Sequence, residues 1–498
     1  MDVSVTARPR PETPAPPEPP LYATRQRVYP KTVSGDFRRV KWAILAVCLA
    51  VYYLLPWVRW DRGPNAPDQA LLIDMEGRRA YFFFIEIWPQ EIYFLTGLLI
   101  LAAIALFLVT SLLGRVWCGY ACPQTVWTDL FMAVERAIEG DRVQRMRLDK
   151  APLSMNKLWR KTAKHSAWVL IAAATGGAWV MYFQDAPTLA RQVFVGEASS
   201  STYVFAGLFT VSTYVLAGWA REQVCTYMCP WPRFQAAMLD EHSLTVTYQK
   251  WRGEPRGKHK SGESWDGRGD CVDCTACVQV CPTGIDIRDG QQMECIGCGL
   301  CIDACDEIMD KVGRPKGLIR LSTQVTQDAC AAGRPAPEWR LLRPRTLIYA
   351  VVLATVGAIM LVALLIRPTV EIAVLRDRNP LYVTLSDGSV RNAYTLKVLN
   401  KTRDGHEYAL TAPGLAGAAL TMVDARTSAP SSSLTLAARP DSVATYRVFV
   451  TLPAADAPRG DRPLTFDLTD RATGATTRYR SVFIEPEDGH HHDDRKGR

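Results

Sequence analysis

Cysteine is absent from long stretches of this 498-residue chain, although the chain contains 14 cysteines in all. None follows Cys330, and only Cys48 precedes Cys118. The first twenty residues lack the apolar core of a cleavable signal peptide and are rich in proline, which predicts a disordered tail over residues 1–33. No aromatic-basic platform accompanies the net charge of +8, so the sequence does not predict nucleic-acid binding.

Eight cysteines are concentrated in two runs that share one spacing, C-x2-C-x2-C-x3-C. The first run is Cys271, Cys274, Cys277 and Cys281, and the second is Cys295, Cys298, Cys301 and Cys305. This pattern is typical of bacterial ferredoxins that bind two [4Fe–4S] clusters through thiolates, so it predicts one-electron transfer. A zinc ribbon or a disulfide knot is the alternative, but zinc sites take four ligands in two pairs rather than two quartets.

The spacing also predicts how the ligands are shared, because the fourth cysteine of each run binds the other run's cluster in such folds. One cluster is assigned to Cys271, Cys274, Cys277 and Cys305, and the second to Cys295, Cys298, Cys301 and Cys281. Asp306 stands where the first run has Pro282. This difference leaves the conformation of the local turn undecided, but it does not change the ligand assignment.

Five segments are long and apolar enough to cross a bilayer, which takes about 20 residues each. They are residues 41–58, 92–113, 165–183, 201–219 and 346–366. The fifth is uncharged and the clearest, whereas the first is short and runs into Pro56 and Arg59. A buried helix of a soluble protein is the alternative for one such segment, but not for five with charged flanks.

Lysine and arginine are concentrated before the first span and after the second, which predicts that these parts lie in the cytoplasm. Five spans then place residues 367–498 on the outer side of a bacterial inner membrane. Apart from Cys48, every cysteine falls on the predicted cytoplasmic side, where reducing conditions protect thiols. The basic excess is thus explained by topology and by attraction to the anionic lipid bilayer.

The predicted fold is a multi-domain membrane protein. An α-helical bundle of about five spans, with an internal two-span repeat, carries a cytoplasmic ferredoxin-like α+β insert and a C-terminal all-β immunoglobulin-like sandwich. The expected parts are the tail 1–33, the four-span membrane domain 34–240, the ferredoxin domain 241–340, the fifth transmembrane helix 341–367, the periplasmic sandwich 368–486 and a flexible tail 487–498.

The internal repeat is a C-x-Y-x-C-P element at the end of the second and fourth spans. Cys118 and Cys122 form the first copy, and Cys225 and Cys229 form the second. Duplicated two-span units produce such a pattern and could place the copies side by side. Helical residues four apart have Cβ atoms about 5–6 Å apart, which is too far for an unstrained disulfide at about 3.8 Å. The four cysteines are therefore predicted to bind a soft metal ion or to act as redox thiols.

Packing as small apolar residues between helices is the alternative for these cysteines. The proline after each pair is predicted to break the helix, and Gln124 to Glu139 to form a surface helix with Pro123 in its first turn. Cys48 is interpreted as a core residue and Cys330 as incidental. Three histidines near the C-terminus could bind copper or nickel, but their acidic surroundings favour a solvated tail; they are His490, His491 and His492.

From Thr369 the pattern changes to period two, with about seven short strands separated by Gly, Pro, Asp and Ser. Asp387-Gly388 lies between two strands and predicts a hairpin turn. An immunoglobulin-like sandwich without an inter-sheet disulfide is expected, with a binding or supporting role. Glu86, Trp88 and Glu91 form an acidic and aromatic cluster before the second span, for which an interfacial anchor is the alternative.

The chain resembles the cytochrome oxidase accessory proteins of the CcoG/FixG/RdxA family over nearly everything after residue 25. The resemblance is carried by WCGYACPQTVWTDLF (117–131), YLLPW (53–57), PNAPDQ (64–69) and IEIWPQ (85–90), together with the ferredoxin insert and the sandwich. It implies an inner-membrane protein that matures cbb3-type oxidases by reducing Cu(II) to Cu(I), with oxidase subunits or copper chaperones and transporters as partners. Copper is implied by the resemblance alone; the residues indicate electron transfer beside a soft-metal thiol site.

The expected function is therefore that of a cupric reductase, an oxidoreductase acting on metal ions. A cytosolic donor of unknown identity would feed the two [4Fe–4S] clusters, and copper would be reduced near Cys118, Cys122, Cys225 and Cys229. Two alternatives stay open at this point. One is an electron conduit from a quinol or cytosolic donor to a periplasmic reductase. The other is a non-enzymatic, redox-sensing assembly scaffold.

Overall fold

The computed structural model describes residues 27–64, 66–260, 262–423, 429–453 and 461–485, and the chain forms two compact units. The first unit contains residues 1–49, 106–175 and 207–346, and the second contains residues 50–105, 176–206 and 347–498. His490, His491 and His492, with the predicted tail 487–498 and most of the tail 1–33, lie outside the described residues.

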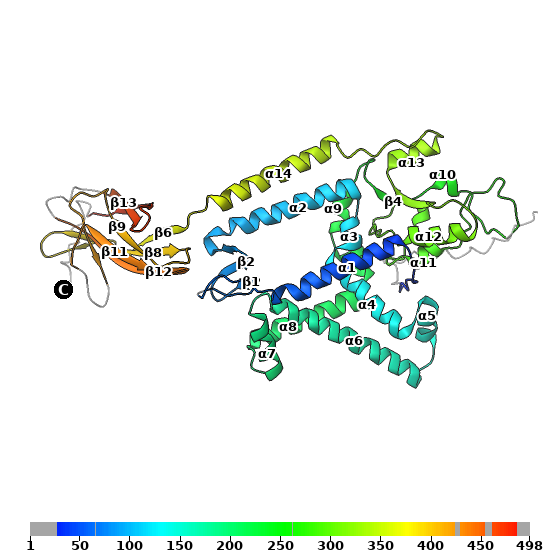
Figure 1. Ribbon diagram of the computed structural model, residues 1–498, viewed down its shortest axis with the longest axis horizontal. Coiled ribbons are helices and arrows are strands. Elements are labelled where there is room, and N and C mark those ends of the chain that lie inside the picture. Colours follow the sequence, from blue (N-terminus) through cyan, green and yellow to red (C-terminus); the bar gives the residue numbers. More distant parts are fainter. Residues whose placement is uncertain (1–26, 65, 261, 424–428, 454–460, 486–498) are drawn as a thin grey trace, which may run out of the picture. The chain divides into compact units, whose positions relative to one another are not determined.

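The chain passes from one unit to the other within five long helices (Figure 1). They are α1 (Asp36–Leu54), α2 (Tyr93–Leu113), α6 (Met155–Val180), α8 (Ser200–Thr213) and α14 (Pro344–Leu365). Within the described residues, four helical segments are long and apolar enough to cross a membrane: Asp36–Trp57, Pro89–Leu113, Ser200–Ala220 and Pro344–Leu365. The multi-domain membrane architecture predicted from the sequence is confirmed.

The third predicted span, residues 165–183, falls in α6 but is not among these four segments. The first turns of α6 carry Lys157, Arg160, Lys161 and Lys164, and six of the 13 residues in its second half are alanine or glycine. Small side chains contribute little transfer free energy, because hydrophobic stabilisation scales with the apolar area removed from water. A crossing at α6 stays a prediction.

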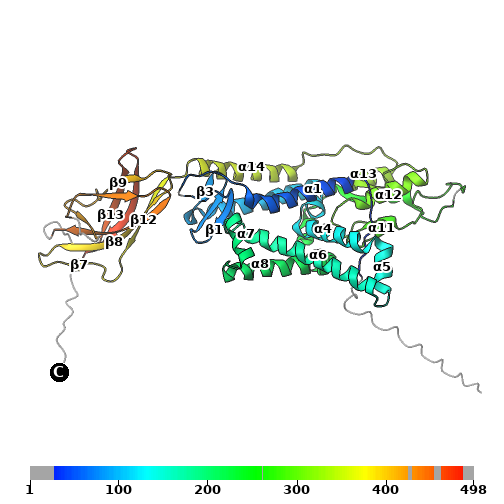
Figure 2. The same ribbon diagram turned by 60° about the horizontal axis from the view of Figure 1, so that its bottom comes forward.

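The first unit carries both cysteine elements on short helices that follow α2 and α8. The α2 helix is followed by α3 (Val116–Tyr120), α4 (Pro123–Glu139) and α5 (Arg142–Lys150). The α8 helix continues as a π-helical segment, Tyr214–Ala220, and a second π-helical segment, Val224–Met228, precedes α9 (Trp231–Met238). Segments of π-helix are rare in proteins, and those that occur are often found at functional sites. Figure 2 shows α4 and α5 beside the start of α6.

The ferredoxin-like part of the first unit has an α+β fold. Its two-stranded antiparallel sheet pairs β4 (Thr245–Tyr248) with β5 (Ile319–Ser322). Its helices are α10 (Lys250–Gly253), α11 (Ala276–Val280), α12 (Leu300–Lys311) and α13 (Gln324–Ala331). The α11 helix ends before Cys281-Pro282, whereas α12 runs on through Asp306, whose carboxylate accepts a hydrogen bond from Gly317 N at 2.8 Å. Proline at 306 would interrupt α12, which explains the departure from the first run.

The second unit contains a small antiparallel sheet that the sequence analysis did not predict, in the order β1 (Leu71–Asp74), β2 (Arg79–Phe82), β3 (Ile85–Ile87). A short helix, α7 (Ala186–Val195), belongs to the same unit. Gln69 joins them, because its buried amide accepts from Ala186 N and donates to the carbonyls of Leu71 and Met181.

The C-terminal part is a sandwich of two antiparallel sheets, as predicted, with nine described strands rather than about seven. One sheet has the order β10-β12-β8-β6 with β7 paired to β8, and the other has the order β11-β9-β13-β14. The bounds are β6 Val370–Arg376, β7 Val383–Thr384, β8 Val390–Asn400, β9 His406–Thr411, β10 Ala419–Met422, β11 Ser433–Ala438, β12 Ser442–Leu452, β13 Arg462–Asp470 and β14 Thr476–Phe483. Alternate residues of β8, namely Tyr394, Leu396 and Val398, are fully buried in its core. The predicted turn at Asp387-Gly388 joins β7 to β8.

Ion pairs connect the β1–β3 sheet to the sandwich within the second unit. Arg79 Nη1 lies 2.6 Å from Asp441 and 3.1 Å from Glu86, and its guanidinium lies over the Trp88 ring at 4.0 Å. Trp88 is only 4% exposed, so it packs beneath this contact rather than serving as an exposed interfacial anchor. Lys401 likewise bridges Glu91 at 2.8 Å and Glu371 at 2.7 Å.

We expect this contact to weaken as the pH rises from about 5 to 8. Burial and the neighbouring Asp441 carboxylate raise the pKa of Glu86 from 4.5 to about 7. Between these values the folded protein holds a proton that the unfolded chain has lost, so stability is greatest at low pH and falls toward pH 7. Glu86→Gln removes the titration and stabilises the contact above pH 7, by on the order of 2 kcal/mol.

Hydrogen exchange of β3 and of the turn at Asp441, corrected for intrinsic rates, measures this effect. In the wild type we expect these segments to open more slowly at pH 5.5 than at pH 8. In Glu86→Gln we expect the same opening rate at both pH values. Glu76→Gln, an exposed carboxylate on the β1–β2 turn, is the matched control and keeps the wild-type difference. An unchanged pH effect in Glu86→Gln would contradict the assignment.

Candidate functional site

The two cysteine elements line one cavity of about 160 Å³ in the first unit. Its walls include Cys118 and Cys122 from the first element and Cys225 and Cys229 from the second. Cys295, from the ferredoxin-like part, lines the same cavity. The structure therefore brings the four thiols of the repeat together, beside a cysteine predicted to bind a [4Fe–4S] cluster.

In each element the first cysteine is helical and the second is extended, which corrects one sequence-based expectation. Cys118 lies in α3 and Cys225 in a π-helical segment, but Cys122 and Cys229 are extended residues that precede the proline of their element. Each pair therefore does not share one helical face, because the residue before a proline avoids the helical region. The helix that starts at Pro123 and ends at Glu139 is present as predicted, but it is not a surface helix, because Phe131, Glu135 and Glu139 are fully buried.

Polar side chains hold the two elements against each other. Gln124, from the first element, donates to the carbonyls of Leu216 at 2.9 Å and Arg221 at 3.2 Å, just before the second element. The Cys118 thiol donates to Gln235 Oε1 in α9 at 3.1 Å. These contacts fix the cavity walls from both sides.

The first element also docks on the loop that contains Cys295 and Cys298. Arg115 donates to the carbonyls of Met293, Cys295 (3.1 Å) and Pro232 (2.8 Å), and Tyr120 Oη donates to the Cys298 carbonyl at 2.9 Å. Gly119 allows this approach, because a Cβ there would lie 2.9 Å from the Ile296 carbonyl oxygen. Arg115 and Tyr120 are functional candidates that sequence reasoning missed as site residues, although both lie in or next to the repeat.

Two thiols of the cavity, Cys118 and Cys225, are protonated at neutral pH unless a cation is present. Burial raises the pKa of Cys118 to about 12 and that of Cys225 to about 11, and neighbouring thiolates add to both shifts. A bound metal ion must therefore displace these protons. Within the described residues, no three His, Cys, Asp or Glu side chains already converge on one point as ligands of a single ion.

The eight ferredoxin-type cysteines fall into two groups in space. A small cavity of about 20 Å³ is lined by five of them, Cys277, Cys281, Cys295, Cys298 and Cys301. Four of these five, all except Cys277, are the residues predicted to hold the second cluster.

The other group contains Cys305, which lies near three thiols of the first run. The pKa of Cys305 is raised to about 12 by burial, and the thiolates of Cys277, Cys271 and Cys274 add to the shift. Burial also raises the pKa of Cys277 to about 11. Buried thiolates of this kind need positive charge nearby, which the irons of a cluster provide, so the donor set fits [4Fe–4S] groups.

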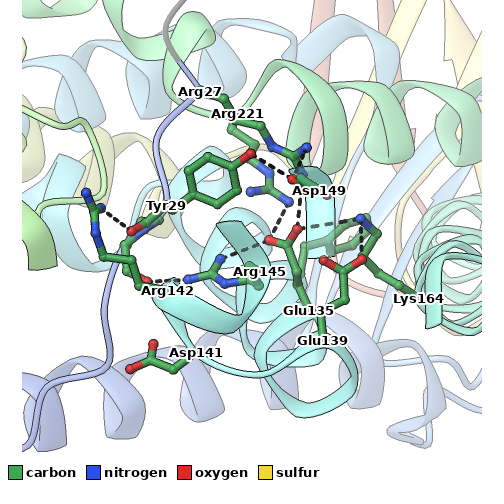
Figure 3. Close-up of polar contacts among 12 residues, drawn as sticks. Arg27, Tyr29, Glu135, Glu139, Asp141, Arg142, Arg145, Asp149, Lys164 and Arg221 are labelled. Atoms are coloured by element: carbon green, nitrogen blue, oxygen red, sulfur yellow. Dashed lines mark hydrogen bonds and ion pairs between the residues drawn. The ribbon is translucent and has the colours of Figure 1, made fainter. Parts of the chain in front are cut away.

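A buried ion-pair network centred on Glu135 of α4 positions the second element (Figure 3). The carboxylate accepts hydrogen bonds from Arg221 at 2.8 Å, Arg145 at 3.2 Å and Arg27 at 3.3 Å, and Lys164 Nζ lies 3.5 Å away. Burial alone would raise the pKa of Glu135, but the cations, Arg221 first, outweigh it and lower this pKa. Arg221 directly follows the π-helical end of α8, so the network fixes the start of the second cysteine element.

Three family models match parts of the chain. One, described as a 4Fe-4S dicluster domain, covers residues 220–324; a second, a 4Fe-4S binding domain, covers residues 95–139; the third, an IG-like fold at the C-terminal of FixG, covers residues 360–486. The second match includes Cys118 and Cys122.

Three curated proteins are similar over most of their length. The nitrogen fixation protein FixG of Rhizobium meliloti is 51% identical, over 87% of this chain and 88% of its own. Proteins RdxA and RdxB of Cereibacter sphaeroides are 52% and 50% identical, over 91% and 93% of this chain and 93% and 97% of their own.

Proposed function

The chain belongs to the FixG/RdxA family of iron–sulfur electron-transfer proteins, and we propose that it reduces Cu(II) to Cu(I) to support assembly of a cbb3-type cytochrome c oxidase. The observation that carries the proposal is the cavity shared by Cys118, Cys122, Cys225, Cys229 and Cys295. It joins four soft donors to the ferredoxin-like part of the chain.

The proposed cluster ligands follow the two groups of cysteines in space. Cys271, Cys274, Cys277 and Cys305 would hold one [4Fe–4S] cluster, and Cys295, Cys298, Cys301 and Cys281 the other. When bound, these clusters supply electrons one at a time. The chain's own contribution is to bury the ligands and to hold the Cys295–Cys298 loop against the first element through Arg115 and Tyr120.

Copper is proposed as the substrate because thiolates favour Cu(I) over harder ions. Each Cu(II) ion takes up one electron, which an external donor provides. The resulting Cu(I) ion prefers soft thiolate ligands more strongly than Cu(II) does. Both pKa values lie far above neutral pH, so the Cys118 and Cys225 thiols carry their protons before the ion binds. The sulfurs lose these protons when they become ligands of the ion.

The proposed topology places the N-terminus and the clusters in the cytoplasm and the sandwich in the periplasm of the inner membrane. It is supported by the passage of the chain between the two units within five helices, α6 included. The lysine and arginine residues around α5 and the start of α6 favour the cytoplasmic side for the first unit. Oxidase subunits, or the chaperones and transporters that carry copper to them, are the proposed partners.

The test is the reaction of anaerobically purified, dithionite-reduced protein with Cu(II), followed by a Cu(I)-specific chromophore. Cys118→Ser combined with Cys225→Ser is expected to slow copper reduction about tenfold or more, because two soft ligands are lost. Iron content and the cluster signal in electron paramagnetic resonance should stay at wild-type levels. Cys330→Ser, a cysteine away from the cavity, is the matched control and should reduce copper normally.

A second candidate is electron transfer to a partner reductase without copper chemistry. It is favoured by the match of a 4Fe-4S binding model to residues 95–139, which include the first element. Cluster reduction by quinol, together with copper reduction that the double serine variant leaves unchanged, would favour this candidate over the copper proposal.

A further inference from the structure

A second cavity of the first unit, of about 320 Å³, has an excess of positive charge. It lies between the N-terminal segment Pro30–Ser34, the first turns of α1, and α4. Lys31, Arg38 and Arg136 contribute cations to its lining, and among the described lining residues Asp129 is the single carboxylate. The cavity is separate from the thiol-lined one and shares no lining residue with it.

The one carboxylate is already used by cations on α1. Arg38 Nη1 donates to both oxygens of Asp129, at 3.0 and 2.9 Å, and Lys41 Nζ lies 4.0 Å from the same group. The second terminal nitrogen of Arg38, Nη2, is buried and has no hydrogen-bond partner in the described part of the chain. Arg38 as a whole is only 8% exposed. A buried guanidinium nitrogen left unpaired costs free energy, and a bound acceptor would recover it.

Arg136 adds a second cation, which Asp129 and Asp141 stabilise only through space. Its side chain makes no hydrogen bond or ion pair with any residue that the structure describes, although it lines the cavity. Burial lowers the pKa of Arg136, and the nearby Arg38 and Arg145 lower it further, so that they outweigh the two carboxylates. Two guanidinium groups that repel each other across a partly closed space form a favourable site for an anion with several oxygens.

We propose that this cavity binds the phosphate group of an anionic phospholipid. Phosphate fits because its oxygens accept forked hydrogen bonds from arginine, here from Arg38 and Arg136, with Lys31 at the rim. Trp42 on α1 also lines the cavity, and the Arg38 guanidinium lies over its ring at 4.5 Å. Tryptophan is enriched at membrane interfaces, and basic pockets beside transmembrane helices on the cytoplasmic side bind lipid headgroups.

The cavity also reaches the ferredoxin-like part, since Val280, Pro282 and Leu300 complete its lining. Val280 and Pro282 flank Cys281, and Leu300 precedes Cys301. A bound phosphate would thus join the membrane surface, α4 and a cluster-binding loop. The phosphate site depends on α1 lying in the membrane and does not depend on copper chemistry. The phosphate proposal can therefore be wrong while the copper proposal is right, and the copper proposal can be wrong while the phosphate proposal is right.

Native mass spectrometry of the purified full-length protein tests the site. The protein is taken from nanodiscs of phosphatidylcholine with one fifth phosphatidylglycerol, and the retained lipid is counted. One phosphatidylglycerol is expected on the wild type, and Arg136→Gln should retain it about tenfold less, because a charge-assisted hydrogen bond to the phosphate is lost. Arg136→Lys should recover part of the binding, because a charge remains but the fork is lost.

The control variant is Arg147→Gln, which removes an equal charge from an exposed position on α5. It should retain the lipid at the wild-type level. A second arm adds inorganic phosphate to protein in neutral detergent; uptake that depends on Arg136, with no lipid retained, supports the phosphate site and identifies its source as soluble. Equal retention by Arg136→Gln and wild type, or no phosphate compound bound in either arm, would overturn the proposal.

Discussion

Glu135→Gln is expected to destabilise the first unit by about 3–5 kcal/mol, because removing one partner leaves buried charges uncompensated. Glu135 is fully buried and pairs with Arg221, Arg145, Lys164 and Arg27. Glutamine keeps the shape of the side chain but removes the charge that these cations share. The second cysteine element, which starts beside Arg221, should then open together with α4.

Hydrogen exchange of the α4 amides and resistance to protease in detergent measure this loss. Glu307→Gln is the matched control: its ion pair with Lys311 is exposed on α12, so the change should stay within about 0.5 kcal/mol. Because the folded pKa of Glu135 is lowered, its contribution is present above its ordinary pKa and is lost as the pH falls below about 4.5. Wild-type protection of α4 in Glu135→Gln would show that the network is not needed for the fold.

Gly119→Val should separate the first cysteine element from the cluster-binding loop. A Cβ at this position would meet backbone atoms, the Ile296 oxygen at 2.9 Å and Cys298 Cα at 3.0 Å, and neither can rotate away. Overpacking of this kind costs about 1–3 kcal/mol, and the two extra methyl groups of valine add to it. We expect iron content to fall, the signal of one cluster to weaken and copper reduction to drop more than tenfold.

The matched control is Gly207→Val in α8, where no heavy atom lies within 4 Å of the added Cβ. It places the same side chain in another helix and should leave iron content and activity unchanged. Normal iron content together with normal copper reduction in Gly119→Val would contradict the docking of the first element on the Cys295–Cys298 loop.

Features that depend on local spacing were predictable from the sequence. The eight ferredoxin-type cysteines, the apolar runs and the alternation of Tyr394, Leu396 and Val398 each encode their structure within a few residues. The repeat also indicated that its two copies could meet, and they line one cavity. In these cases periodicity or ligand spacing alone decides the outcome.

Features that depend on partners distant in the chain were not predictable. Arg115 and the carbonyl of Cys295 are 180 residues apart, and Glu135 and Arg221 are 86 apart. The strands β1 to β3 contain only three or four residues each, too few for a clear alternation. The extended conformation of Cys122 and Cys229 is a local feature, and it agrees with the helix break predicted from the proline that follows each pair.

The hydrogen bonds of Arg115 impose an order on biosynthesis. Its guanidinium needs the carbonyls of Pro232, Met293 and Cys295, which emerge from the ribosome long after Cys118 and Cys122. A nascent chain that has not yet reached Met293 therefore lacks two of these acceptors, and its first cysteine element has no loop to dock on. The wall of the cavity that Arg115 holds is thus completed only after translation has delivered the cluster-binding loop.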